Sequence, residues 1–180
     1  MRIGLLVGDL AHTDGWSHYS LSLVEALRGA GADVTVIAAR SSPAVPGIMQ
    51  HRLLPDVRRE RGILLKQLTA LPAVRAALHG CDVIHTALEP SAPLAALAAG
   101  RRPLFITGHG TYVQLPLMRC PPVNALYRWA FRRGTLMCVS RYTAAVAARV
   151  VPDVKTVVVH NGVDVARFIQ PSRSTSAPLY

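Results

Sequence analysis

Short apolar runs rich in β-branched residues alternate with stretches of helical periodicity along most of this 180-residue chain. Runs that are apolar almost throughout are typical of strands buried on both faces of a parallel sheet. The predicted strands cover residues 3–7, 34–38, 83–86, 104–107, 136–139 and 156–159. Regular alternation of strand and helix predicts an α/β fold, a Rossmann-like doubly wound parallel sheet with helices on both faces.

The helical stretches between these strands have recognisable ends. They cover residues 16–27, 63–78, 91–100, 123–133 and 141–150. Gly29 and Gly31 end the first helix, and Pro152 stops the last. Ser91 is the predicted N-cap of the third, with Pro93 in its first turn. The 180 residues are most simply one domain.

The charge balance bears on the partners of the chain. Twenty Lys and Arg face ten Asp and Glu, and only Lys66 and Lys155 are lysines, so nearly all the positive charge is guanidinium. Arginine binds phosphates in bidentate fashion, which makes phospholipid headgroups, nucleic acid and phosphorylated sugars candidate partners. The aromatic residues follow helix-core spacing rather than alternating with arginine on a strand, so we expect no nucleic acid partner.

Cysteine spacing and hydropathy bear on whether the chain has a metal site, disulfides or a membrane span. Cys81, Cys120 and Cys138 form no C-x-x-C pair, so the spacing indicates neither a zinc site nor a disulfide framework and favours buried thiols for Cys81 and Cys138. No apolar run reaches the ~18 residues of a membrane span. No secretory signal pattern opens the chain, so we expect a cytoplasmic location.

Ligands of doubly wound sheets bind beyond the carboxyl ends of the strands, so the first loop is informative. It lacks both G-x-G-x-x-G and the G-x-x-x-x-G-K-[ST] phosphate loop. Gly15 stands at the entrance to a helix, where free N–H groups favour a phosphate; the alternative is that it only permits a tight turn. Arg40, Ser41 and Ser42 after the second strand could mimic an NADP site, which keeps a reductase domain as an alternative.

A histidine between two glycines follows the strand at 104–107. The small neighbours of His109 let a ligand approach the backbone closely, which favours a functional over a purely structural histidine. His12, His18 and His160 also lie near strand ends, but no carboxylate or cysteine has suitable spacing, so no metal site is predicted.

Four segments in order carry a family resemblance: D-G-W-S-H at 14–18, T-G-H-G at 107–110, V-S-R-Y-T at 139–143 and N-G-V-D, followed by Phe168, at 161–168. With them, residues 1–169 resemble the N-terminal, acceptor-side Rossmann-like domain of family-four GT-B glycosyltransferases. Residues 170–180, rich in Ser and Pro, are predicted to be a linker or disordered tail.

The resemblance implies roles for particular residues. It makes His109 the catalytic residue, offered to the donor sugar across the cleft, and places an interdomain hinge at Asn161, Gly162 and Asp164. The implied acceptor- or phosphate-binding residues are Gly15, Trp16, Ser17, His18, Thr111, Tyr112, Ser140 and Arg141.

The resemblance also implies what the chain lacks. The family holds its donor mainly through a C-terminal domain with an E-x7-E motif, and the three glutamates here have no such spacing. Two local departures are Asp14-Gly15 in place of two glycines, and Arg133-Gly134-Thr135-Leu136 before Ser140, where relatives tend to show Ala-Asp. We therefore expect the acceptor-binding half of a retaining glycosyltransferase, inactive alone, that pairs with a C-terminal donor-binding domain or subunit. The nucleotide-sugar is a substrate, and no cofactor is expected.

A second hypothesis is a non-catalytic basic module that docks on anionic membranes. Residues 51–68 combine apolar side chains with a local excess of positive charge, as interfacial segments do. The predicted membrane contacts are Arg58, Arg59, Arg61 and Lys66, which would place the protein at the inner face of the membrane. The alternative is a solvated loop followed by a core helix. In the leading hypothesis the acceptor is a lipid, a glycan or a small, sugar-like or phosphorylated molecule.

Overall fold

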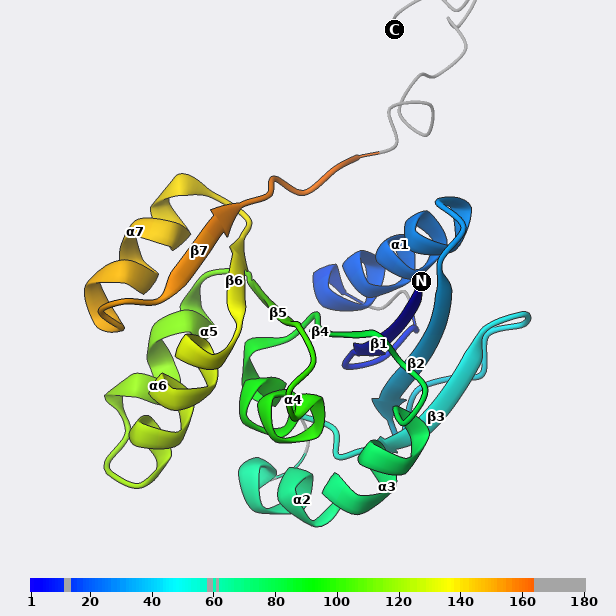
Figure 1. Ribbon diagram of the computed structural model, residues 1–180, viewed down its shortest axis with the longest axis horizontal. Coiled ribbons are helices and arrows are strands. Elements are labelled where there is room, and N and C mark those ends of the chain that lie inside the picture. Colours follow the sequence, from blue (N-terminus) through cyan, green and yellow to red (C-terminus); the bar gives the residue numbers. More distant parts are fainter. Residues whose placement is uncertain (12–13, 58–59, 61, 164–180) are drawn as a thin grey trace, which may run out of the picture.

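A computed structural model describes residues 1–11, 14–57, 60 and 62–163 of the chain. In this part, the strands form one parallel sheet in the order β3-β2-β1-β4-β5-β6-β7 (Figure 1). They are β1 Arg2–Leu6, β2 Asp33–Ala39, β3 Met49–Leu54, β4 Val83–Thr86, β5 Leu104–Gly108, β6 Thr135–Cys138 and β7 Lys155–Val158. The predicted Rossmann-like parallel sheet is confirmed.

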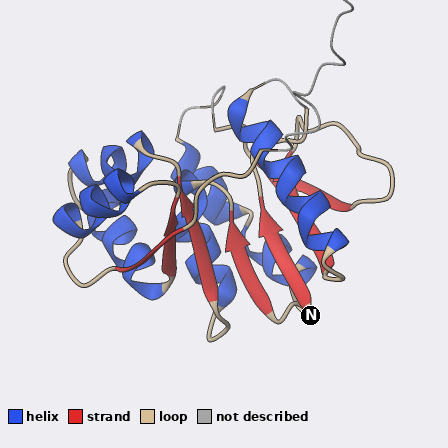
Figure 2. Ribbon diagram, turned by 90° about the horizontal axis from the view of Figure 1, so that it is seen from above, coloured by secondary structure: helices blue, strands red, loops and turns tan. Residues whose placement is uncertain are grey.

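Helices cover both faces of the sheet. They are α1 Gly15–Gly29, α2 Ile63–Thr69, α3 Leu71–Ala77, α4 Ala92–Ala99, α5 Thr111–Gln114, α6 Val123–Arg133 and α7 Arg141–Val150, with 3₁₀ turns η1 Glu89–Ser91 and η2 Leu115–Met118. Helix α1 lies over one face at the β1–β2 side, and α2, α3 and α4 lie on the other (Figures 1 and 2).

Alternation along β1 builds a separate core on each face. Leu5 and Val7 pack with Val24 of α1, whereas Leu6 points into the larger core beneath α3, α4 and α6. Because side chains of a strand alternate between the two faces, one apolar strand supplies both cores. Cys81 and Cys138 are buried, as predicted, and Cys120 is exposed.

Strand β3 was not predicted. It lies at the edge of the sheet and pairs only with β2, in parallel. Its sequence includes Gln50, His51 and Arg52, because an edge strand need not be apolar on both sides. The first residues of the predicted membrane segment, 51–54, are therefore part of the sheet.

Two predicted helix features were wrong in detail. The helix predicted at 63–78 is two helices, α2 and α3, that meet at Ala70, because Pro72 in the first turn of α3 interrupts a continuous hydrogen-bond ladder. Ser91 precedes α4, but its hydroxyl does not cap that helix. It accepts instead a 3.0 Å hydrogen bond from Gln67 Nε2 of α2.

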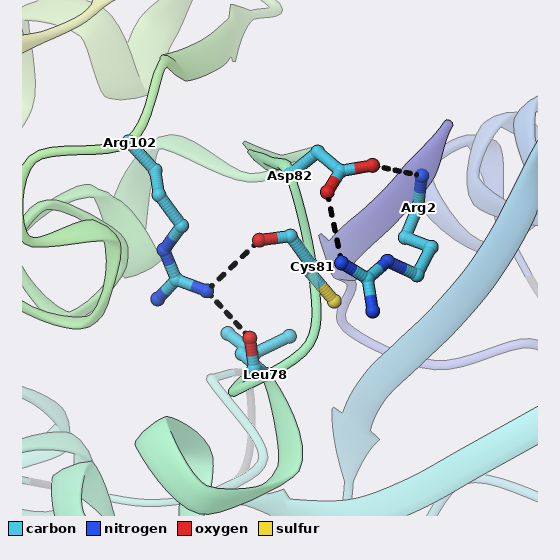
Figure 3. Close-up of polar contacts among 5 residues, drawn as sticks. All are labelled: Arg2, Leu78, Cys81, Asp82 and Arg102. Atoms are coloured by element: carbon cyan, nitrogen blue, oxygen red, sulfur yellow. Dashed lines mark hydrogen bonds and ion pairs between the residues drawn. The ribbon is translucent and has the colours of Figure 1, made fainter.

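Arginines hold together the edge of the sheet at the amino ends of the strands (Figure 3). Arg2 of β1 pairs with Asp82 at 3.2 Å, and its backbone N–H donates to the same carboxylate at 2.8 Å, so the pKa of Asp82 is lowered. Arg102 donates to the carbonyls of Leu78 and Cys81, which links the segment before β5 to the turn after α3.

Other guanidinium groups also bind backbone carbonyls. Arg75, Arg128, Arg132 and Arg133 donate to Leu97, Val150, Pro152 and Gly100 respectively. Six of the twenty basic residues that suggested phosphate partners therefore also bind within the fold. Within the described residues, no helix is long and apolar enough to cross a membrane.

Candidate functional site

The candidate site lies at the carboxyl ends of the strands, opposite the arginine contacts, where β1, β4, β5 and β6 end. The pairing of Gly108 with Cys138 aligns the ends of β5 and β6, so His109 and Ser140 both follow at this edge. Helix α1 begins at Gly15, after the loop that follows β1. Segments that are far apart in the sequence thus meet beyond the carboxyl ends of the strands, as expected for this class of sheet.

His109 is held at two points. Its backbone N–H donates to Glu89 Oε1 at 2.6 Å, and its Nε2 lies 2.9 Å from the Ala87 carbonyl oxygen. Because a carbonyl oxygen only accepts, Nε2 carries the hydrogen, and the neutral ring leaves Nδ1 as an acceptor. Burial lowers the pKa of His109, which favours this neutral form near pH 7.

An aromatic wall surrounds the His109 ring. Tyr19 of α1 meets it edge to face, with ring centroids 4.7 Å apart, and the Trp16 centroid lies 6.5 Å away. Trp16 in turn contacts Tyr112 of α5 at 5.1 Å. The structure thus brings together three of the predicted site residues and adds Tyr19, whose helical spacing had indicated only core packing.

A buried polar layer supports this wall. The Tyr19 hydroxyl lies 3.3 Å from Thr107 Oγ1, which lies 2.8 Å from His85 Nε2. Burial is the main cause that lowers the pKa of His85 to about 4, and the charge of nearby His109 adds to it. His85 and Thr107 lie within apolar runs that predict strands, so their sequence context gave no sign of this role.

Glu89 is the buried acid of the site. It is fully buried, and Oε1 accepts from the backbone N–H groups of His109 at 2.6 Å and Gly110 at 3.3 Å. Its Oε2 is also buried and has no hydrogen-bond partner among the described residues. Burial raises the pKa of Glu89 to about 7. Sequence reasoning assigned no role to Glu89, although an acid three positions after the end of a buried strand was a usable signal.

The N-terminus of α1 differs from the anion site that the sequence suggested. Asp14 caps the helix, and its carboxylate accepts from the backbone N–H groups of Trp16 at 2.8 Å and Ser17 at 3.1 Å. The N–H of His18 donates to the Asp14 carbonyl. The N–H groups of Trp16 and Ser17 already donate to the Asp14 carboxylate. A phosphate at this helix end would therefore compete with that carboxylate for the same donors. The binding roles of Gly15, Trp16, Ser17 and His18 stay predictions.

At the start of α7, Ser140 is a helix cap. Its Oγ accepts from the Thr143 N–H at 3.1 Å, which accounts structurally for the serine. Arg141 is exposed. Thr111 begins α5, directly after Gly110.

A groove of about 680 Å³ runs between α1 and the segment after β7. Its lining includes His18, Tyr19, His160, Asn161 and Gly162. Two of the three predicted hinge residues therefore border the groove, and the third, Asp164, lies outside the described residues.

The predicted membrane contacts are only partly within the described residues. Arg58, Arg59 and Arg61 lie outside the described residues, and Lys66 forms an ion pair with Glu60 at 2.7 Å. In the part of the chain that the structure describes, no group of three His, Cys, Asp or Glu residues could hold a metal ion.

The comparisons with known proteins agree with this architecture. Sucrose-phosphate synthase from Thermosynechococcus elongatus has a similar fold, with a TM-score of 0.69 and 19% identity over 92% of this chain and 49% of the synthase chain. Anabaena HepE, solved in complex with UDP, has a TM-score of 0.65 and 18% identity over 92% of this chain and 45% of its own. The chain thus spans about half the length of these structures, and its fold is one Rossmann-like half of the GT-B arrangement.

A model of glycosyltransferase family 4 matches residues 13–167. The chain therefore belongs to glycosyltransferase family 4. No curated protein sequence matches it. The reductase alternative loses its support, because Ser42 is buried and its hydroxyl accepts from the Leu10 N–H and from Gln50 Nε2 within the fold.

Proposed function

We propose that this chain is the acceptor-binding half of a retaining glycosyltransferase, which moves a sugar from a nucleotide-sugar to a lipid, glycan or small-molecule acceptor. The observation that carries the proposal is the His109 imidazole, fixed through Nε2 with Nδ1 left as an acceptor at the carboxyl edge of the sheet. Family membership supplies the reaction class.

The chemistry of this edge favours a hydroxyl-bearing ligand. A neutral Nδ1 accepts a hydrogen bond and cannot donate one, so it suits a sugar hydroxyl and not a phosphate oxygen. The negative charge of the Asp14 carboxylate at the start of α1 also disfavours an anion there, by electrostatic repulsion. In this proposal, a donor-binding partner half holds the nucleotide diphosphate, and no cofactor takes part.

Exposed valines at the β7 end of the sheet support the proposal of a partner half. Helix α1 covers β1 and β2, whereas Val157 and Val159 at the other end of the sheet are 42% and 44% exposed. The groove between α1 and the segment 159–163 lies beside them. In this proposal the partner half covers these valines and the groove beside them.

The test is reconstitution. The purified 180-residue chain should not transfer sugar from UDP-glucose to a panel of lipid and glycan acceptors. Adding a donor-binding half of family 4 that carries E-x7-E should restore turnover, and the product should keep the anomeric configuration of the donor. Turnover by the chain alone, or an inverted product from the reconstituted enzyme, would overturn the proposal.

The predicted membrane contact stays part of the proposal for the lipid-acceptor case. Leu65 of α2 is 70% exposed beside Lys66, an apolar side chain placed as interfacial residues are. Vesicles with anionic lipid should sediment more of the protein than neutral vesicles at low salt, and Arg58→Glu with Arg59→Glu and Arg61→Glu should abolish the difference. The matched control is Arg101→Glu with Arg119→Glu and Arg149→Glu, which makes the same change of charge at three exposed arginines outside this segment and should keep the difference. Equal binding to neutral and anionic vesicles would exclude electrostatic docking.

A further inference from the structure

Burial of the Glu89 carboxyl is unfavourable in free energy, and the proposed sugar transfer gives no reason for a carboxyl at this position. It is fully buried, and only one of its oxygens has hydrogen-bond partners among the described residues. A buried carboxyl with an unpaired oxygen is unfavourable relative to an apolar side chain, because its lost hydration is only partly replaced. The partners that it does have are the backbone N–H groups of His109 and Gly110.

One short segment after β4 makes both attachments to His109. Ala87 supplies the carbonyl oxygen that accepts from the imidazole, and Glu89, two residues further on, accepts from the backbone N–H. Attachment of both the main chain and the ring end fixes the orientation of the side chain between them. Tyr19 also packs against the ring, edge to face with centroids 4.7 Å apart.

The backbone at His109 and Gly110 has an unusual conformation that hydrogen bonds can stabilise. Gly110 has φ +140°, in a region that residues with a side chain rarely adopt, so the turn after His109 depends on glycine. Oε1 of Glu89 accepts from two consecutive backbone N–H groups, those of His109 and Gly110, which flank the Cα of His109. With both N–H groups occupied, the loop meets a ligand through the imidazole rather than through its backbone.

We propose that Glu89 is a positioning residue, whose carboxyl holds the backbone of His109 and Gly110 and so fixes the imidazole with Nδ1 toward the ligand. The catalytic consequence rests on the proposed function, but the positioning itself belongs to this chain alone. Among the described residues only Oε1 has hydrogen-bond partners, so the amide oxygen of a glutamine can accept the same two hydrogen bonds.

Nuclear magnetic resonance of the 180-residue chain tests the positioning directly. The variants are Glu89→Leu, which removes the acceptor, and Glu89→Gln, which keeps it. In Glu89→Leu, the amide protons of His109 and Gly110 should move upfield and exchange with solvent ~10- to ~100-fold faster. The His109 ring should change from one tautomer, protonated at Nε2, to a mixture. Glu89→Gln should restore both readouts.

Gln67→Leu is the matched control. Gln67 is fully buried in α2, and its amide donates to Ser91, so its loss also removes a buried polar group close to Glu89. It should leave the His109 and Gly110 signals unchanged. If Glu89→Leu leaves them unchanged too, or if Gln67→Leu disturbs them equally, the positioning role is refuted. If Glu89→Leu does not fold, Glu89→Gln still decides, because loss of the Nε2 tautomer in that variant refutes it.

The reconstituted enzyme separates this proposal from the proposed function. A normal resonance pattern with no sugar transfer by any variant would refute the function and leave the positioning intact. Turnover that falls in Glu89→Leu and returns in Glu89→Gln, with the ring tautomer following the same order, supports both. Full turnover in Glu89→Leu with a displaced ring would refute the catalytic consequence.

Discussion

Replacement of His109 by alanine should lower kcat/KM of the reconstituted enzyme by roughly 10- to 100-fold, the loss expected for one well-placed hydrogen bond in a desolvated site. The expectation follows from the proposed function and from the ring geometry. Nε2 is committed to the Ala87 carbonyl, and Nδ1 is the acceptor for a sugar hydroxyl. Steady-state kinetics at saturating donor give the comparison.

The same change should affect the fold much less. The side chain is only partly buried, and its loss removes one hydrogen bond and the contact with Tyr19, about 1–2 kcal/mol of the free energy of unfolding. His79→Ala is the matched control, because His79 is exposed near the other edge of the sheet, in the turn after α3, and should change neither quantity. Equal kcat/KM for His109→Ala and His79→Ala would show that His109 has no catalytic role.

The sheet itself could be predicted where burial on both faces imposes an apolar run. All predicted strands correspond to observed ones, because β1, β2, β4, β5 and β6 have neighbours on both sides and β7 keeps valines at its edge. Strand β3 could not be found in this way. As an edge strand it keeps Gln50 and Arg52, whose polarity masks its period.

The site could be predicted only in part, because its support comes from contacts between distant segments. Gly-His-Gly after a strand singled out His109 as a candidate from local sequence, and its site role stays a prediction. The bonds to Glu89 and Ala87 cross 20 and 22 positions, and the Tyr19–Thr107 contact crosses 88, so no local pattern reveals them. The N-terminus of α1 shows the converse, since Asp14 was visible in the sequence, but only the structure shows that it occupies the N–H groups of Trp16 and Ser17.

Glu89→Gln should make the free energy of unfolding rise relative to wild type by about 3 kcal/mol between pH 4.5 and pH 7.5. Burial raises the pKa of Glu89 from 4.5 to about 7 in the folded protein. Between these values the folded state keeps a proton that the unfolded state has released. Wild type therefore loses stability as the pH rises through this window, and glutamine, which does not titrate, removes that loss.

His85 changes the free energy of unfolding with pH in the opposite direction to Glu89, over an overlapping pH range. Its pKa is lowered from 6.5 to about 4, so its contribution to stability is lost as the pH falls from 6.5 toward 4. In wild type the two effects oppose each other between pH 4.5 and 6.5. The Glu89→Gln variant should therefore become steadily more stable across this range, where wild type changes little through these two groups.

Urea denaturation at intervals from pH 4.5 to 7.5 measures the effect. The groups that share the surroundings of Glu89 are Tyr127, Cys138 and His109, and burial keeps Tyr127 and Cys138 neutral by raising their pKa values to about 12 and about 11. His109, with its lowered pKa, is mostly neutral over the upper part of the range. Glu89 itself is then the group whose charge changes between pH 6 and 7.5. Glu25→Gln, at an exposed glutamate of α1, should follow the wild-type curve throughout. If Glu89→Gln also follows the wild-type curve, Glu89 ionises in the folded protein near its ordinary pKa, and its buried oxygen must then have a partner in solution.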